Sequence, residues 1–274
     1  MKPPRFTYHA PGTLDEALEL LAARPNARPL AGGQSLMPML NFRLAAPEHL
    51  VDLNRIEALA FIREENDAIV IGAMTRQRDI ERSELVAQRL PLITEAIRMV
   101  GHRPTRNRGT LGGSLAHLDP AAELPAVAMA LDAQIGVRSR RGARILPMAH
   151  FGTGLLSTAL DPDELVTEVR FPIWPSGHGH AFEEFARRHG DFAIVSVAAL
   201  VHADRVSITL GGVAPVPLRA TSAEEHFART RHITEAAALC GEIDTFADHA
   251  YPAWYRKKLA VSLTQRALER ACKK

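Results

Sequence analysis

The stretch Arg108-Gly109-Thr110-Leu111-Gly112-Gly113-Ser114-Leu115-Ala116-His117-Leu118-Asp119-Pro120 combines glycines, two hydroxyl side chains and a helix-start signal. A related stretch, Ala31-Gly32-Gly33-Gln34-Ser35-Leu36, lies far upstream. Glycine lets the main chain adopt positive φ and approach a ligand closely. Main-chain N–H groups and hydroxyls donate hydrogen bonds to phosphate oxygens. We therefore expect two loops that hold one phosphate-bearing ligand, a dinucleotide, between two parts of the chain.

Other interpretations of these residues stay open. A single Gly-Gly pair is more often only a turn, and neither stretch has Rossmann or Walker spacing. Asp119 before Pro120 is most often only a helix cap, and Glu123 can be a solvated acid favoured by the helix dipole. The functional alternative is that Asp119 or Glu123 accepts a hydrogen bond from the ribose or base of the ligand.

The composition excludes several classes of protein. The chain has 274 residues, 46% of them hydrophobic, and a net charge of +2, so it offers no strong field for nucleic acid. Two cysteines, Cys240 and Cys272, are too few for an iron–sulfur cluster and form no Cys-x-x-Cys motif. No catalytic triad, carboxylate pair or metal-ligand spacing is present, so we predict no catalytic and no metal-binding residue.

The sequence also predicts where the protein resides. No apolar run is long enough for a membrane span, and the N-terminus lacks the apolar region of a signal peptide. The low cysteine content fits a reducing compartment. We expect a cytoplasmic protein without an integral membrane segment.

Periodicity predicts a β-α-β unit over residues 1–55. A capping box at Thr13 and Glu16 starts a helix that extends to about Arg24. The strands expected around this helix cover residues 6–8, 28–31 and 50–53.

Residues 56–174 alternate between hairpin and helix signals. Thr75 is expected to cap a short helix, Pro91 to open a longer one that ends at Gly101, and Asp119-Pro120 to start a third. The expected strands cover residues 59–63, 68–73, 134–139, 143–146 and 164–171.

The glycine- and proline-rich residues 175–179 form the best candidate for a linker. Three strands are predicted beyond it, at 181–187, 193–202 and 206–211, with a turn at Ala203-Asp204. Helices are predicted over 234–240 and 255–271. The fold class is therefore α+β, in at least two domains.

Together these motifs resemble a known family, the FAD-binding medium subunits of the molybdenum hydroxylases, which include carbon monoxide dehydrogenase and xanthine dehydrogenase. The resemblance covers essentially the whole chain. The stretches that carry it are 31–36 with Arg43, 106–117, 119–125, 187–195, 211–217 and 255–259.

The resemblance implies a two-lobed FAD-binding domain of the PCMH, or vanillyl-alcohol-oxidase, type. Residues 1–55 would form its N-terminal lobe and residues 56–174 its second lobe. Residues 180–274 would form a smaller C-terminal domain of the carbon monoxide dehydrogenase flavoprotein type, with a three-stranded sheet and helices.

The resemblance also implies roles in non-covalent FAD binding. The first stretch would bind the diphosphate, and Thr110, Gly112, Gly113, Ser114 and His117 would lie along the rest of the cofactor. The expected FAD-binding residues are Ala31, Gly32, Gly33, Gln34, Ser35, Leu36, Thr110, Gly112, Gly113, Ser114, His117, Asp119, Glu123, Leu165, Val166, Asp191 and Phe192. Leu165 or Val166 would touch the adenine end, and Asp191 and Phe192 the isoalloxazine ring.

Three departures from the family pattern affect this assignment. Pro104-Thr105 alters the entry to the second stretch, and Leu118 replaces a small residue. A lysine found near Glu183 in some relatives is absent, so its cofactor contact is not expected. The scarcity of cysteine disfavours the 4-hydroxybenzoyl-CoA reductase branch, which carries a 4Fe–4S cluster in this subunit.

In such complexes the flavin receives electrons from two 2Fe–2S clusters of a small subunit and passes them to a terminal acceptor. A large molybdopterin-binding subunit oxidises the substrate, and the resemblance implies a dimer of heterotrimers. Two alternatives stay open: an independent FAD oxidase of a small alcohol or amine, and a non-catalytic partner-binding module.

Overall fold

The first part of the chain forms a small parallel sheet in the computed structural model, which describes residues 1–203 and 205–273. Its elements are β1 (Thr7–His9), α1 (Leu14–Ala23), β2 (Ala27–Leu30), α2 (Leu36–Asn41) and β3 (His49–Asp52). The strand order is β1-β3-β2, with both pairs parallel. Thr13 Oγ1 accepts from the Glu16 N–H at 3.2 Å and Glu16 Oε2 accepts from the Thr13 N–H at 3.3 Å, which confirms the capping box.

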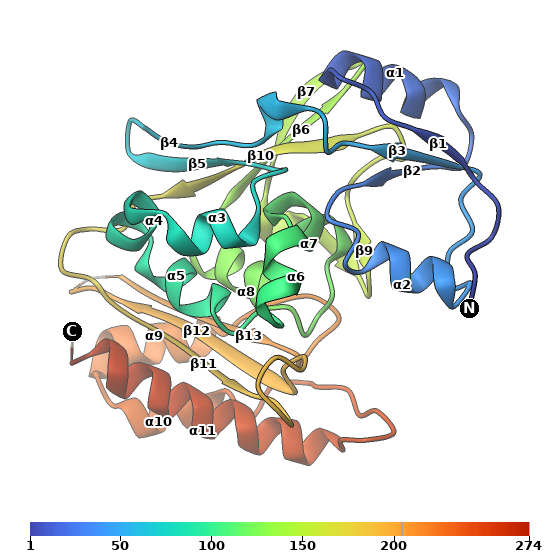
Figure 1. Cartoon of the computed structure of the whole chain (residues 1–274). Coiled ribbons are helices and arrows are strands. Elements are labelled where there is room, and N and C mark those ends of the chain that lie inside the picture. Colours follow the sequence, from blue (N-terminus) through green and yellow to red (C-terminus); the bar gives the residue numbers. More distant parts are fainter. Residues whose placement is uncertain (204, 274) are drawn as a thin grey trace.

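A second, antiparallel sheet occupies the centre of the molecule (Figure 1). Its strands are β4 (Ile62–Glu65), β5 (Ala68–Gly72), β6 (Gln134–Ser139), β7 (Gly142–Pro147) and β10 (Leu165–Pro172), and the short pair β8 (Gly152–Gly154) and β9 (Ser157–Thr158) lies apart from it. The order is β4-β5-β10-β6-β7, so β10 joins the two predicted hairpins by pairing with β5 and β6. Both hairpins are confirmed.

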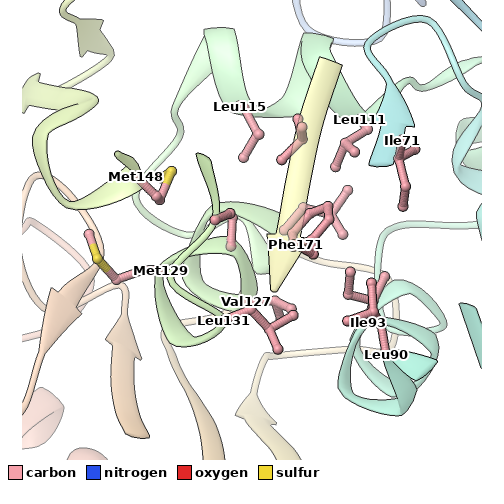
Figure 2. Packing of buried hydrophobic residues seen from close by; sticks show 14 of the residues in the cluster. Ile71, Leu90, Ile93, Leu111, Leu115, Val127, Met129, Leu131, Met148 and Phe171 are labelled. Carbon is pink, nitrogen blue, oxygen red and sulfur yellow. The ribbon is translucent and has the colours of Figure 1, made fainter. Parts of the chain in front are cut away.

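Five of the six helices between β5 and β6 share one core with the central sheet. The helices are α3 (Gln77–Arg82), α4 (Glu84–Arg89), α5 (Pro91–Ile97), α6 (Arg103–Arg108), α7 (Leu111–His117) and α8 (Glu123–Ala130), with 3-10 turns at Glu57–Leu59 and Met148–His150. The helix α6 contributes no buried residue to this core. Figure 2 shows Phe171 of β10 among apolar side chains that include Leu111 of α7, Val127 of α8 and Ile93 of α5. All eight residues of α8 are buried, so this helix is enclosed on every side.

The C-terminal part is a four-stranded antiparallel sheet between two helical layers. Its elements are β11 (Gly179–Phe185), β12 (Val195–Val201), β13 (Val206–Gly211), β14 (Leu218–Arg219), α9 (Thr221–Thr230), α10 (Ile233–Leu239) and α11 (Ala253–Ala271). Successive side chains of a strand point to opposite faces. Phe182 and Ala198 therefore join the core around α8, whereas Ala181 and Val197 pack with the C-terminal helices. In Figure 1, α8 lies on one side of this sheet and α9, α10 and α11 lie on the other. The α+β class is confirmed, and β14 extends the three predicted strands.

Three local predictions about helix starts were wrong. Gly112 and Gly113 lie in the first turn of α7, not in a loop, because Thr110 caps this helix by accepting from the Gly113 N–H. Asp119-Pro120 does not open α8, which begins at Glu123; instead Asp119 Oδ1 accepts from the Ala121 N–H at 2.9 Å in a local turn. Thr75 caps no helix, since its hydroxyl is bonded to both main-chain groups of Phe61.

Other elements were not foreseen. The helices α4, α6 and α9 are additional to the predicted ones. Pro104 lies in the first turn of α6, where a residue without an N–H is tolerated. The turn expected at Ala203-Asp204 includes Asp204, which lies outside the described residues.

Within the described ranges, no helix combines the length and apolar character needed to cross a membrane.

Phe171→Ala should lower the free energy of unfolding by about 3–5 kcal/mol, because Phe171 is 1% exposed and its removal leaves a cavity in the shared core. Phe42→Ala is the matched control, since Phe42 is 66% exposed and should change stability by less than about 0.5 kcal/mol. Urea unfolding followed by circular dichroism measures both. Equal losses in the two variants would contradict the assignment of the core.

Candidate functional site

The two glycine stretches meet in space. Gly32 is buried against the end of α6, where an added Cβ would overlap the carbonyl oxygen of Arg108 and lie 2.9 Å from Gly109 Cα. An added Cβ on Gly113 would lie 3.4 Å from Ala31 Cβ. The absence of a side chain at Gly32 is therefore a requirement of main-chain packing, and the predicted meeting of the stretches is present in the structure.

The side chains of Asn54 and Arg76 stabilise the junction between Gly32 and the Arg108–Gly109 peptide with hydrogen bonds. Asn54 Nδ2 donates to the Ala31 carbonyl at 3.0 Å, and Arg76 donates to Asn54 Oδ1 at 2.6 Å and to the Arg108 carbonyl at 2.5 Å. Burial, together with the charge of Arg108, lowers the pKa of the Arg76 guanidinium. Neither residue was predicted. Asn54 directly follows a strand that ends beside the first stretch, which is a usable signal, whereas nothing in the sequence singles out Arg76.

The free hydrogen-bond donors lie in the first stretch. Within the part of the chain that the structure describes, the N–H groups of residues 32–35 donate no hydrogen bond. Gly33 has φ +73°, a conformation that favours glycine and turns the chain sharply before α2. By contrast, the Gly112 N–H donates to the Ala73 carbonyl at 2.9 Å and the Gly113 N–H to Thr110 Oγ1 at 3.1 Å. The first stretch therefore offers a run of main-chain donors to an anion.

The second stretch offers side chains instead. Thr110 is buried as the cap of α7, while Ser114 and His117 are half-buried on that helix. Leu118 ends α7 with φ +49° and is fully buried in the core. An apolar anchor thus occupies the position where the family pattern has a small residue.

Glu123 begins α8 and is only 3% exposed. Desolvation raises the pKa of this carboxyl to about 8, and the negative charges of Glu184 and Asp119 act in the same direction, opposed by a main-chain hydrogen bond. Glu123 is therefore protonated at neutral pH, and it can donate a hydrogen bond as well as accept one.

Glu184 lies on the face of β11 toward α8, and burial raises the pKa of its carboxyl to about 7. Its neighbour Glu183 points the opposite way, to α11, where it pairs with Arg266 at 2.7 Å and with Arg270, which also bonds Glu95 of α5. Glu183 is consequently a structural ion-pair residue. Sequence analysis did not single out Glu184.

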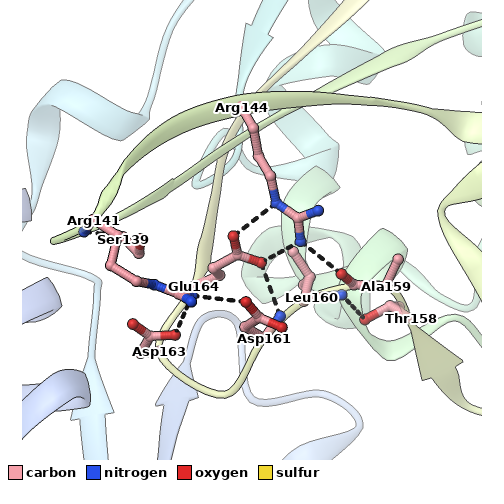
Figure 3. Close-up of polar contacts among 9 residues, drawn as sticks. All are labelled: Ser139, Arg141, Arg144, Thr158, Ala159, Leu160, Asp161, Asp163 and Glu164. Carbon is pink, nitrogen blue, oxygen red and sulfur yellow. Dashed lines mark hydrogen bonds and ion pairs between the residues drawn. The ribbon is translucent and has the colours of Figure 1, made fainter.

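Leu165 and Val166 begin β10 with buried side chains, Leu165 in the cluster against which Ala31 packs and Val166 in the main core. Any ligand contact from these positions falls to the main chain. Figure 3 shows what holds this end of β10: Arg144 donates to Glu164 Oε1 at 2.7 Å and to Oε2 at 2.6 Å. The Arg144 guanidinium lowers the pKa of the Glu164 carboxyl, so the pair stays ionised.

Asp191 and Phe192 lie in the turn between β11 and β12. Asp191 pairs with Arg188 at 3.2 Å, and the Phe192 ring is 60% exposed. An added Cβ on Gly190 would overlap the ring of His102, so this turn packs at the start of α6. The same short helix therefore has this turn at one end and the Gly32 junction at the other.

Leu36, Gln34 and Ser35 complete the first stretch at the start of α2, where Gln34 Nε2 donates to the Gly32 carbonyl at 3.3 Å. The structure thus brings residues 31–36 and 109–114 together, and it places Glu123 opposite Glu184. The side chains of Leu165 and Val166 are buried in core clusters, so these residues can contact a ligand only with their main-chain atoms.

Two family models match the chain. The model described as the FAD binding domain in molybdopterin dehydrogenase matches residues 4–174, and the CO dehydrogenase flavoprotein C-terminal domain matches residues 180–271. Among characterised proteins, the chain is 40% identical to the 6-hydroxypseudooxynicotine dehydrogenase complex subunit alpha of Paenarthrobacter nicotinovorans, over 99% of this chain and 96% of that one.

Solved structures agree with these matches. The chain superposes on a carbon monoxide dehydrogenase chain from Hydrogenophaga pseudoflava with a TM-score of 0.96 and 38% identity, covering 100% of this chain and 99% of that one. It superposes on a chain of quinoline 2-oxidoreductase from Pseudomonas putida 86 with a TM-score of 0.94 and 35% identity, over 100% and 99%. The chain therefore belongs to the family of FAD-binding medium subunits of the molybdenum hydroxylases, and it is an oxidoreductase subunit whose cofactor is FAD.

Proposed function

We propose that the chain is the electron-transfer subunit through which a molybdenum hydroxylase passes electrons to a terminal acceptor. The electrons come from the 2Fe–2S clusters of a small partner subunit, and a large molybdopterin-binding subunit oxidises the substrate. The observation that carries the proposal is the run of free N–H groups at residues 32–35, beside the hydroxyl-bearing helix α7. The surrounding sequence matches an FAD-binding family over more than half of the chain.

The residues fit FAD in a specific way. A diphosphate needs several converging donors, which the unpaired N–H groups of the first stretch supply. The remaining assignments follow the chain along the cofactor: Thr110, Gly112, Gly113, Ser114 and His117 beside its middle, Asp119 and Glu123 at the acidic position, Leu165 and Val166 near the adenine, and Asp191 and Phe192 at the isoalloxazine ring. FAD binds without a covalent bond in this proposal.

Bound FAD supplies the electron-transfer chemistry, and the protein supplies position and electrostatics. The junction fastened by Asn54 and Arg76 fixes the distance between the diphosphate turn and α7. Phe192 presents an exposed aromatic face, which can lie against a planar ring system. We assign no catalytic acid or base among the described residues.

The division into domains is part of the proposal. Residues 1–55 and 56–174 would form the two lobes of the FAD-binding domain, and residues 180–274 the C-terminal domain. This division is supported by the different sheets to which the three segments contribute: the parallel sheet, the central antiparallel sheet and the C-terminal sheet.

The assembly would be a dimer of heterotrimers in the cytoplasm. The cytoplasmic location is supported by the two cysteines, Cys240 and Cys272, which are both free thiols. The relatives named above carry different substrates in their names while sharing this fold, so we place substrate choice in the large subunit.

Gly33→Val should reduce FAD affinity by roughly tenfold or more, which corresponds to about 1.4 kcal/mol or above. A β-branched residue is strained at φ +73° and crowds the turn that carries the free N–H groups. The matched control is Gly177→Val, because Gly177 has φ +80° but no atom within 4 Å of its added Cβ. Flavin absorbance per chain after gel filtration measures retention. Equal flavin content in both variants would place the diphosphate elsewhere.

Phe192→Ala should shift the midpoint potential of the bound flavin while leaving FAD occupancy close to one per chain. The ring is exposed and forms no part of a core cluster, so its loss does not disturb the fold. Redox titration of the holoprotein measures the shift, with Phe42→Ala as the control. A potential equal to that of the control would remove Phe192 from the flavin site.

Affinity purification of the tagged chain from its native host should recover a molybdopterin-containing large chain and a small iron–sulfur chain in equal amounts. The mass of the complex should equal twice that of one heterotrimer. Recovery of an FAD-containing chain that oxidises a small alcohol or amine by itself would instead support an independent oxidase.

A further inference from the structure

A row of polar residues crosses the C-terminal sheet on its face toward α8. Glu184 of β11 is paired in register with Ser196 of β12, which is paired with Gly211 of β13. An added Cβ on Gly211 would overlap Ser196 Oγ and lie 3.5 Å from Ala126 Cβ of α8. Ala126 lies one turn after Glu123 on α8, so the row lies opposite the start of the helix that carries Glu123.

Among the residues that the structure describes, no positive charge acts on this site. Glu184 Oε2 and Ser196 Oγ are both buried without a hydrogen-bond partner among the described residues. The side-chain charges that act on Glu123 are those of Glu184 and Asp119, both negative. The adjacent Glu183 differs because two arginines of α11 pair with it on the other face of the sheet. The chain therefore has an arginine-paired glutamate and an unpaired one at successive positions.

A proton is the group that can neutralise such a site. Burying two carboxylates together without a counter-charge is strongly unfavourable, and a carboxyl group avoids that state by keeping its proton. Within the described ranges, no cluster of three or more histidine, cysteine or acidic side chains could hold a metal ion instead.

We propose that Glu123 and Glu184 form a proton-binding carboxyl pair, which retains at least one proton at neutral pH and sets the charge beside the flavin. The statement about the flavin rests on the proposed function, whereas the pair itself follows from the packing of α8 on the sheet.

The two carboxyls release their protons in order. Glu184 is half-buried and ionises first, and its charge then holds the proton on the more deeply buried Glu123. Both folded-state pKa values lie above that of an unfolded glutamate, so the folded protein binds more protons than the unfolded chain. The stability contributed by protonation is complete below the unfolded pKa of about 4.3 and is lost as the pH rises through the folded values.

The first test compares unfolding at about pH 5.5 and about pH 9 for the wild type, Glu123→Gln and Glu184→Gln. The amide keeps the shape of the neutral acid at every pH, so both variants should lose less stability at alkaline pH than the wild type. Glu225→Gln is the control, since Glu225 is exposed on α9 and should behave as the wild type. An identical alkaline loss in all four proteins overturns the proposal. Glu184 is half-exposed, so its variant keeps the test valid if Glu123→Gln does not fold.

Infrared spectroscopy gives a direct readout that needs no flavin. At neutral pH the wild type and Glu225→Gln should show the carbonyl stretch of a protonated carboxylic acid, and this band should be weaker in Glu123→Gln, where only Glu184 can still hold a proton. A band of wild-type intensity in both Glu123→Gln and Glu184→Gln would assign the proton to other groups and overturn the pair.

The flavin readout uses the holoprotein. At about pH 9 the midpoint potential of Glu184→Gln should lie above that of the wild type, because a negative charge near the flavin disfavours its reduction. At about pH 5.5 the two potentials should coincide. A constant offset at both pH values overturns the charge effect on the flavin. Failure to bind FAD at all refutes the proposed function, while the unfolding and infrared tests still decide the carboxyl pair.

Discussion

The close main-chain contact between Gly32 and the Arg108–Gly109 peptide is the constraint on which the rest of the site depends. Any side chain at Gly32 would occupy the space of the Arg108 carbonyl group, so the two stretches can meet only through glycine. The hydrogen bonds of Asn54 and Arg76 to both sides then fix their relative position. Because these side chains hold the junction, the N–H groups of residues 32–35 form no hydrogen bond among the described residues and can bind a ligand.

The two stretches are similar in sequence but opposite in construction. In the first, the N–H groups of residues 32–35 donate no hydrogen bond among the described residues. In the second, the N–H groups of Gly112 and Gly113 donate to Ala73 and Thr110, and the half-buried side chains of Ser114 and His117 remain. One ligand with a charged centre and long uncharged arms uses both kinds of surface. The pairing therefore explains why a single chain needs two glycine-rich segments for one cofactor.

The sequence predicted most strands, the helices α1 and α11 and the α+β class, because these depend on periodicity and capping that act locally. The sequence-based prediction failed where a tertiary contact decides whether a segment forms a helix or a loop. Gly112 and Gly113 have low helix propensity, yet Thr110 caps a helix there and Gly112 packs directly on Ala73. Likewise, the family resemblance supplied the candidate site residues but not Arg76 or Glu184, whose contacts are with residues far away in the sequence.

Glu183 and Glu184 also show what a sequence cannot state by itself. Two identical residues at successive positions face opposite sides of one strand, and one meets two arginines while the other meets a carboxyl. The difference arises because α11 packs on the face of the sheet that carries Glu183, whereas α8 packs on the face that carries Glu184.

The complete burial of α8 has a consequence for how the chain is made. During synthesis this helix leaves the ribosome well before β12 and β13, the strands that cover one of its sides. Until those strands emerge, a mostly apolar helix surface stays uncovered in the nascent chain, and such surfaces are prone to aggregation and to chaperone capture. The core around α8 is therefore completed only once the C-terminal sheet has emerged to cover it.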